Sequence, residues 1–324
     1  MNSERPPLSR GALDRDAATR GDEGLLRAAW QDPAARVLLV RGAEIPVLAG
    51  SSAEDGTLAL VPSSGELVLA DDRGRARTLY LGRTPRGPVF AVLDDADGAD
   101  AEAGASVAQG SQLPHSTAWI HPFEAGELLD DTERELVSVA AALARWHEAA
   151  GFSPRDGGAT EPMQAGWARR DAHGAELFPR TDPAVIVLIE HGDRILLGSN
   201  ALWEAGRFSL LAGFVEAGES LEQAVAREVF EESGVRLGRI EYVTSQPWPF
   251  PRSLMLGFRA ELADGVDPEA LHPDPEEISE LRWFTREELR DPDPGLRLPM
   301  SLSIARWLID RWVAGELGGA ARGE

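Results

Sequence analysis

The chain has 324 residues, of which 43% are hydrophobic, and its 32 basic and 54 acidic side chains give a formal net charge of −22. This length and apolar content predict two or three folded domains and exclude a wholly disordered protein. Because the chain has no cysteine, it can hold neither a disulfide nor a cysteine-ligated metal. The excess of acid argues against broad, sequence-independent binding of duplex nucleic acid.

The sequence contains no sign of a membrane or secretory segment. No run approaches the roughly 18 uninterrupted apolar residues of a membrane-spanning helix, and residues 1–20 include no apolar core region. We therefore expect a cytoplasmic protein that has no membrane partner.

We expect residues 1–20 to form a flexible tail and residues 21–150 to form a β-rich domain that ends in a helix. The expected strands are short apolar runs separated by Gly, Pro and Asp clusters. They lie at residues 37–40, 58–61, 67–69, 78–81 and 89–92. Residues 94–111 lack bulky apolar side chains, which is typical of an insertion or linker.

A helix is expected after this linker. Thr132 and Glu135 fit a capping box, in which the two side chains satisfy free amides of the first turn. Apolar residues then recur at helical spacing. They are Leu136, Val139, Ala140, Leu143 and Trp146.

The second half of the chain predicts a mixed α/β domain. Apolar runs at residues 185–189 and 194–197 flank His191-Gly192-Asp193, a hairpin signal. Further strands are expected at residues 208–211, 254–260 and 281–284, and a closing helix at 303–313.

Residues 213–235, GFVEAGESLEQAVAREVFEESGV, contain the most informative helix of the chain. Ser220 and Gln223 form a capping box, and Gly234 stands where a left-handed helix end is expected. These signals predict a helix over residues 221–233.

Glu228, Glu231 and Glu232 lie at spacing i, i+3, i+4, on one face of this helix. Like charges repel at this spacing, and the helix C-terminus is already the negative end of the dipole. A solvated acidic face could tolerate the repulsion, whereas Mg²⁺ or Mn²⁺ would turn it into attraction. Arg227 can pair with Glu231 at i+4 and orient it.

The segment resembles the Nudix hydrolase signature. The matching positions are Gly213, Glu219, Arg227, Glu228, Val229, Glu231, Glu232, Gly234 and Val235. The resemblance implies an α/β (α+β) Nudix fold, in which a mixed β-sheet lies between helices. It also implies an enzyme that hydrolyses a nucleoside diphosphate linked to another moiety. It makes Glu228 and Glu232 expected metal ligands, Glu231 a ligand or general base, and Arg227, Glu231 and Glu232 the expected catalytic residues.

The segment at residues 245–253, SQPWPFPRS, follows the signature. Its three prolines favour an extended backbone that presents Trp248 and Phe250, and such rings suit stacking on bases. A proline-stiffened loop whose aromatic residues are buried in the core is the alternative.

The same segment resembles the NADH pyrophosphatase subfamily, which cleaves NAD(H) to nicotinamide mononucleotide and AMP and has members that remove NAD caps from RNA 5′ ends. The resemblance extends over residues 150–312. It implies metal binding by Glu277 and the Ala212 backbone in addition to the helix glutamates. The implied substrate-binding residues are Phe178, Gln246, Pro247, Trp248, Pro249, Phe250, Pro251, Arg252, Ser253 and Ala305.

The chain departs from the subfamily where a four-cysteine zinc ribbon is usual. The corresponding residues are Ser153, Asp156, Asp171 and His173. These are poor ligands for a tetrahedral zinc site, so we expect no structural zinc. The resemblance also implies a homodimer.

The resulting division places a degenerate zinc-ribbon segment at residues 151–180, the Nudix hydrolase domain at 181–315 and a tail at 316–324.

Two alternatives to an NAD(H) diphosphatase stay open. One is a Nudix hydrolase of another nucleoside diphosphate derivative such as ADP-ribose, and the other is a non-catalytic nucleotide sensor. Four arginines, Arg169, Arg170, Arg180 and Arg252, could form a patch for phosphates or be ordinary surface charge.

Overall fold

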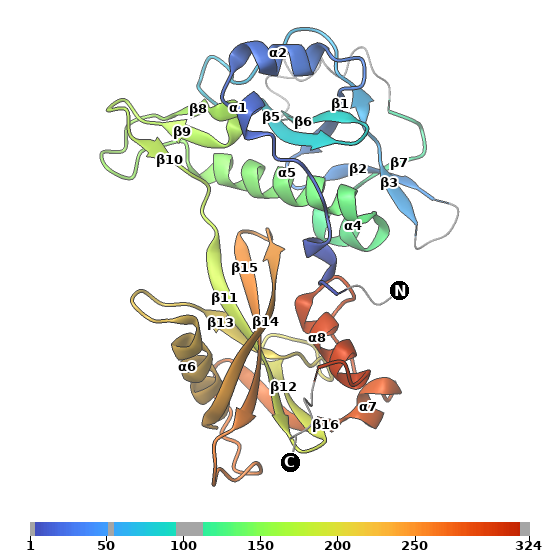
Figure 1. Ribbon diagram of the computed structural model, residues 1–324, viewed down its shortest axis with the longest axis vertical. Helices are drawn as coiled ribbons and strands as arrows, with labels where there is room; N and C mark the ends of the chain where they lie inside the picture. The colour runs from blue at the N-terminus through green and yellow to red at the C-terminus, as the bar shows by residue number, and fades with distance from the viewer. Residues whose placement is uncertain (1–3, 51–54, 95–112, 318–324) are drawn as a thin grey trace, which may run out of the picture. The chain divides into compact units, whose positions relative to one another are not determined.

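The computed structural model of the protein describes residues 4–50, 55–94 and 113–317 (Figure 1). The chain forms two compact units. The C-terminal unit consists of Met1–Ser9, Thr181–Trp248 and Ser253–Glu324, and the N-terminal unit consists of Arg10–Arg180 and Pro249–Arg252. Within the described ranges, every helix is too short or too polar to span a lipid bilayer.

The N-terminal unit is built on a sheet of order β4-β1-β6-β5, in which β1 and β6 run parallel. Smaller sheets have the orders β3-β2-β7 and β10-β9-β8. Its strands are β1 Arg36–Arg41, β2 Ile45–Ala49, β3 Gly56–Leu58, β4 Val61–Pro62, β5 Thr78–Thr84, β6 Gly87–Asp94, β7 Thr117–Ile120, β8 Glu161–Met163, β9 Ala168–Arg170 and β10 Glu176–Leu177. Its helices are α1 Ala17–Arg20, α2 Glu23–Gln31, α4 Pro122–Leu128, α5 Asp131–Ala149 and the short η2 Gln164–Gly166.

Three predictions for this half need correction. The run at residues 58–61 is split between β3 and β4. Residues 67–69 form no strand, and Leu67 and Leu69 pack instead against a hydrophobic cluster that includes Trp30 and Phe90. The described part of the expected tail folds into η1 (Pro7–Ser9) and α1, because Leu8 and Leu13 are buried. The linker expected at 94–111 lies, except for Asp94, outside the described residues.

Helix α5 is capped two residues earlier than the sequence predicts. Asp130 and Glu133 form the capping box, and the helix begins at Asp131. Glu135, the expected partner of Thr132, instead accepts a hydrogen bond from the Leu13 amide at 2.8 Å. The sequence contains two overlapping capping boxes, Asp130/Glu133 and Thr132/Glu135. The second does not form, because Glu135 binds the Leu13 amide.

The positions that correspond to a zinc ribbon contact one another in pairs. Ser153 Oγ donates to Asp171 Oδ2 at 3.2 Å, and His173 Nε2 lies 2.6 Å from Asp156 Oδ2. Asp171 also accepts from the amides of His173 and Ala175. Direct hydrogen bonds therefore join the two turns of this segment.

The C-terminal unit contains a six-stranded mixed sheet of order β14-β15-β11-β12-β16, with β13 paired to β11. Its strands are β11 Asp182–His191, β12 Arg194–Asn200, β13 Leu211–Phe214, β14 Leu237–Trp248, β15 Ser253–Leu262 and β16 Ile278–Thr285. Its helices are α6 Leu221–Ser233, α7 Arg286–Arg290 and α8 Ile304–Val313, together with η1.

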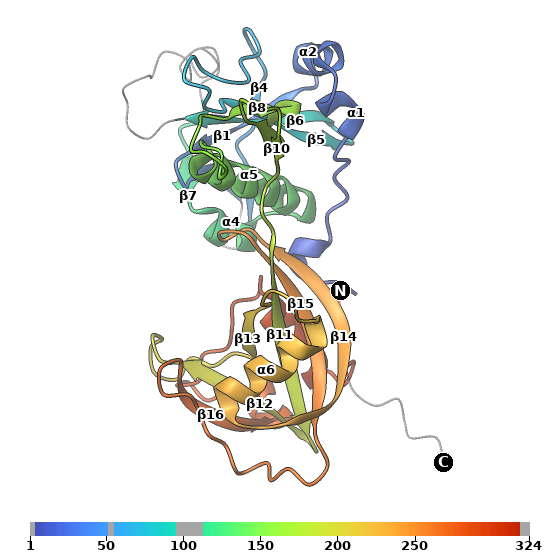
Figure 2. The same cartoon turned by 90° about the vertical axis from the view of Figure 1, so that its left-hand side faces the viewer.

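Helices cover both faces of this sheet (Figures 1 and 2). Alternate residues of β11 face opposite sides: Ile186 and Leu188 join a cluster with α8, whereas Val185 and Val187 join a cluster with α6. The mixed α/β architecture with a sheet between helices is thus confirmed.

Most of the expected elements in this unit are also confirmed. The hairpin turns at Gly192 between β11 and β12, and α8 begins after Ser303. The strand expected at 208–211 lies later, at β13, because only Ser209 of its first residues pairs, in an isolated bridge with Gly198.

Candidate active site

Helix α6 forms where the sequence predicts it and holds most of the acidic side chains of the site. The Ser220 amide donates to Gln223 Oε1 at 2.7 Å, and the Gln223 amide donates to Ser220 Oγ at 3.3 Å. Gly234 ends the helix with φ of 73°, a left-handed conformation that glycine adopts without strain. The helix boundaries, which the signature requires, thus come from local sequence signals.

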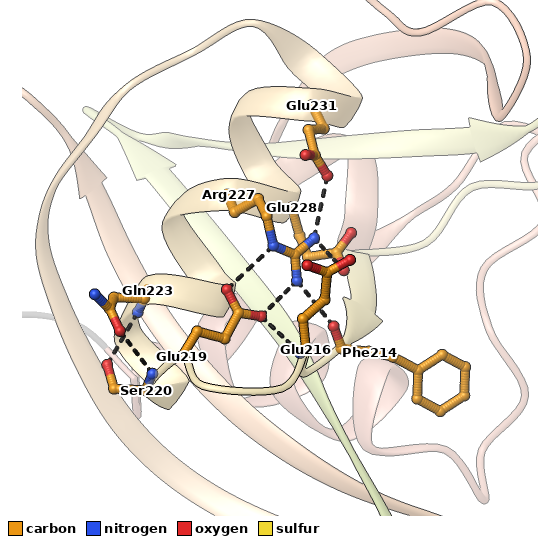
Figure 3. Close-up of polar contacts among 8 residues, drawn as sticks. All are labelled: Phe214, Glu216, Glu219, Ser220, Gln223, Arg227, Glu228 and Glu231. Atoms are coloured by element: carbon orange, nitrogen blue, oxygen red, sulfur yellow. Dashed lines mark hydrogen bonds and ion pairs between the residues drawn. The ribbon is translucent and has the colours of Figure 1, made fainter.

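Arg227 is the centre of a polar network around this helix (Figure 3). Its guanidinium binds both carboxylate oxygens of Glu219, at 3.1 and 2.6 Å. It also donates to Glu231 at 3.1 Å and to the Phe214 carbonyl at 3.0 Å, and it lies 2.9 Å from Glu228. Because one arginine joins the preceding loop, β13 and two helix glutamates, it orients the whole segment.

Gly213 on β13 lets the helix carboxylates approach the sheet. A Cβ atom built at Gly213 would lie 1.9 Å from Cδ of Glu228, far inside van der Waals contact. Any larger residue here would displace the Glu228 side chain. The glycine is required for this close approach and not for an unusual φ angle.

Glu232 is the most buried acidic residue of the cluster. Its side chain is buried, and Oε2 has no hydrogen-bond partner. Burial, together with the nearby carboxylates of Glu228 and Glu277, raises the pKa of Glu232 to about 8 against the opposing effect of a hydrogen bond from the Ala212 backbone. Burial likewise raises the pKa of Glu228. Glu228, Glu232 and Glu277 therefore carry more negative charge than Arg227 offsets, and protons or a cation would neutralise the rest.

The donor set fits a hard divalent cation. Among the described residues, no group of three or more His, Cys, Asp or Glu side chains is placed so that it could hold a metal ion. Yet the unpartnered carboxylate oxygen of Glu232 lies beside two further carboxylates, Glu228 and Glu277. Oxygen donors of this kind are those that Mg²⁺ and Mn²⁺ prefer.

A cavity of about 310 Å³ lies beside these carboxylates in the C-terminal unit. Four residues singled out in the sequence line it, namely Ala212, Glu232, Trp248 and Ala305. Ala305 is in the first turn of α8, where backbone amides have no acceptor within the helix. The cavity thus combines one carboxylate, that of Glu232, with an aromatic ring and a helix N-terminus.

Gln246, which the sequence analysis places among the substrate-binding residues, is wholly buried. Its side-chain amide donates to the Leu302 carbonyl at 2.9 Å, and its Oε1 accepts from the Ile304 amide at 2.7 Å. Both ends of the side chain therefore bind the backbone that leads into α8. Pro247 and Ser253 lie in the paired strands β14 and β15.

The remaining predicted substrate-binding residues belong to the N-terminal unit, and a substrate-binding role for them stays a prediction. These residues are Phe178, Pro249, Phe250, Pro251 and Arg252. The Phe250 ring lies 5.7 Å from that of Phe123, edge to face. Phe250 also lines a separate cavity of about 380 Å³ in that unit. Phe178 is exposed.

Two features were not anticipated. Trp203 lines the acidic cavity, although no pattern around it in the sequence marks it as functional. Arg169, which the sequence suggested for a surface patch, is buried in the N-terminal unit and donates to His147 Nδ1 at 2.9 Å. Only the folded chain shows either placement.

The chain is similar to known proteins. The model of the NUDIX domain matches residues 180–306. The NAD-capped RNA hydrolase NudC of Mycobacterium tuberculosis (strain ATCC 25618 / H37Rv) is 40% identical over 324 residues, which cover 96% of each chain. The NAD-capped RNA hydrolase NUDT12 of Homo sapiens is 38% identical over 209 residues, 59% of this chain and 44% of that protein. A solved NUDIX hydrolase from Nitrosomonas europaea has 23% identity and a TM-score of 0.36, and the match covers 45% of this chain and 96% of that one.

Proposed function

Because the chain belongs to the Nudix hydrolase family, we propose that it hydrolyses the pyrophosphate of NAD(H) and removes NAD caps from RNA 5′ ends. Water adds to one phosphorus, and the bond from that phosphorus to the bridging oxygen breaks. Free NAD(H) then yields nicotinamide mononucleotide and AMP. The structural observation behind this proposal is the buried, unpartnered Glu232 carboxylate in the wall of a cavity that also contains Trp248.

A divalent cation, Mg²⁺ or Mn²⁺, is part of the proposal. Glu228, Glu232 and Glu277 would hold it, with Glu231 and the Ala212 backbone as further donors. When bound, the cation offsets the charge of the pyrophosphate and lowers the pKa of a water molecule. The raised pKa values of Glu228 and Glu232 support this assignment, since a nearby cation would restore their ionised forms.

Residues of the protein itself would act as the general base and bind the phosphate and the nucleoside. Arg227 positions Glu231, with which it already forms a hydrogen bond, so Glu231 is one candidate for the general base and Glu232 is the other. In the first turn of α8, Gln246 binds the Ile304 amide and Ser303 Oγ binds the Arg306 amide, so the Ala305 amide is the one that would donate to a phosphate or carbonyl oxygen. Trp248 offers an aromatic surface to the nucleoside.

Product analysis tests this function directly. The full chain is incubated with NADH and Mg²⁺ or Mn²⁺, and with NAD-capped RNA, alongside Glu232→Gln and the surface control Glu222→Gln. We expect reduced nicotinamide mononucleotide and AMP from NADH, and a 5′-monophosphate RNA from the capped transcript. The products should be absent with Glu232→Gln and undiminished with Glu222→Gln. Cleavage of ADP-ribose alone would replace the proposed substrate, and no cleavage of any substrate would favour a nucleotide sensor.

Two finer properties are also proposals. A homodimer is implied by the subfamily resemblance, and sedimentation velocity of the full chain would test it, because a dimer has twice the mass of the 34.9 kDa chain. A cytoplasmic location is a prediction from the sequence, which cell fractionation would test.

A further inference from the structure

Trp203 lies on the connection between β12 and β13, outside helix α6. Its side chain lines the same cavity as Glu232 and Trp248 and keeps 37% of its surface exposed. Among the described residues, it belongs to none of the hydrophobic clusters that make up the cores. A large aromatic residue in this position contributes little to core packing, so its place in the cavity wall needs another explanation.

The backbone around Trp203 is held in place. The Trp203 amide donates to the Asn200 carbonyl at 3.0 Å, and the amide of its neighbour Leu202 donates to Asn200 Oδ1 at 2.9 Å. The Ala201 amide donates to the backbone carbonyl of Glu277 at 2.7 Å. The connection that positions the indole is therefore tied to the backbone of a proposed metal ligand.

One further contact orients the ring itself. The Arg207 guanidinium carbon lies 4.8 Å from the centroid of the Trp203 ring, a cation–π geometry. Since this contact restrains the indole before any ligand arrives, stacking on it would cost little side-chain entropy.

We propose that Trp203 is a specificity-determining residue that stacks on the heteroaromatic ring of one nucleoside of the substrate. This inference rests on the proposed function and deepens it. A cavity of about 310 Å³ is at the small end of ligand sites, so it accommodates one nucleoside and leaves the other half of the dinucleotide outside. Trp203 and Trp248 are then the aromatic residues that the C-terminal unit contributes to this cavity.

Steady-state kinetics of three variants test the proposal. Trp203→Ala should raise the KM for NADH about tenfold or more, as expected for loss of one aromatic stack, and should change kcat by less than about threefold. Trp203→Phe should retain most of the affinity. Leu202→Ala, at a neighbour that is 93% exposed and does not line the cavity, should match the wild type. An unchanged KM for Trp203→Ala would overturn the proposal.

Binding of the two products identifies the stacked ring and separates this proposal from the function on which it rests. Calorimetry with AMP and with nicotinamide mononucleotide should show that Trp203→Ala weakens one of them about tenfold and leaves the other unchanged. Equal affinity of wild type and variant for both would overturn the stacking role, even if the wild type cleaves NADH. A third outcome is that the wild type cleaves no substrate but Trp203→Ala binds AMP or nicotinamide mononucleotide more weakly than the wild type does. In that case the hydrolase proposal fails and the stacking role stands.

Discussion

Arg227 donates two hydrogen bonds to Glu219, from Nε to Oε2 at 3.1 Å and from Nη2 to Oε1 at 2.6 Å. Glu219 also accepts from the Glu216 amide at 2.8 Å, so the pair fixes the loop before α6 to the middle of that helix (Figure 3). Hydrogen bonding to Arg227 lowers the pKa of Glu219. Only a planar guanidinium binds a carboxylate in this two-pronged way.

The first prediction concerns this pair. Glu219→Gln removes a charge and one acceptor, so Arg227 loses the partner that sets its orientation toward Glu231. We expect kcat for NADH to fall about 10- to 100-fold, as is usual when a residue that orients ligands is changed, with a smaller change in KM. Glu222→Gln removes an exposed carboxylate from the first turn of the same helix and should leave kcat within about twofold. Similar losses in both variants would show that the general charge of the helix matters and the pair does not.

The second prediction separates the two candidate bases. Glu231→Gln and Glu232→Gln are compared by turnover of NADH and by calorimetric binding of AMP. Replacement of the general base should abolish turnover and leave AMP binding within about twofold. Because Glu232 is buried beside Glu228 and Glu277, its replacement should in addition weaken binding of Mn²⁺. Equal and mild losses of turnover in both variants would exclude a dedicated base at either position.

Local sequence signals predict the elements that local contacts determine. The capping box at Ser220 and the glycine at 234 set the bounds of α6, and both lie within the helix's own neighbourhood. The cap of α5 was misplaced because the Glu135 carboxylate binds Leu13, which is 122 residues away in the sequence. Residues 67–69 have strand-like composition, but Leu67 and Leu69 pack against the core, and within the described part of the chain Leu69 is bonded to the neighbouring backbone only through its carbonyl, which accepts from the Arg77 and Thr78 amides.

The residues of the site also fall into two groups, those that the sequence predicts to lie together and those that contacts between distant segments bring together. The glutamates of α6 and Arg227 share one helix, so their spacing already predicts their proximity. Gln246 and Trp203 depend on contacts between distant segments: Gln246 binds the backbone before α8, more than 50 residues later in the chain, and Trp203 is placed by a loop bonded to Glu277. No periodicity in the sequence encodes such contacts.

The third prediction concerns Gln246. Gln246→Leu is similar in size but leaves the Leu302 carbonyl and the Ile304 amide without partners, so we expect a loss of about 1–3 kcal/mol in the free energy of unfolding. The α8 N-terminus at Ala305 should shift, which would raise the KM for NADH. Gln246→Glu keeps the acceptor for the Ile304 amide but turns a carboxylate oxygen toward the Leu302 carbonyl at a wholly buried position, so it should lose stability as well. If Gln246 instead contacts substrate directly, Gln246→Leu will raise the KM without lowering the urea midpoint.

The fourth prediction concerns His147 in the N-terminal unit. Its Nε2 lies 2.8 Å from the Gly166 carbonyl, and its Nδ1 lies 2.9 Å from a guanidinium nitrogen of Arg169. These partners require a neutral ring with the proton on Nε2. The pKa of His147 is lowered from 6.5 to about 4, because burial and, to a smaller extent, the charge of Arg169 outweigh the Gly166 hydrogen bond, which raises it.

The sign of the pH effect follows from these values. Well above pH 6.5 the ring is neutral in both the folded and the unfolded chain, so the contribution of His147 to stability does not change with pH. As pH falls from 6.5 toward 4, the unfolded chain binds the proton first, and folding loses about 1.4 kcal/mol per pH unit from this residue, about 3 kcal/mol in all.

Urea unfolding of the wild type and of His147→Gln at pH 7 and at pH 5 tests this effect. Between these two pH values the wild type should lose about 2 kcal/mol more in the free energy of unfolding than the variant does. His115→Gln, at an exposed position of the same unit, serves as the control and should parallel the wild type. Parallel curves for His147→Gln and the wild type would mean that His147 titrates alike in both states.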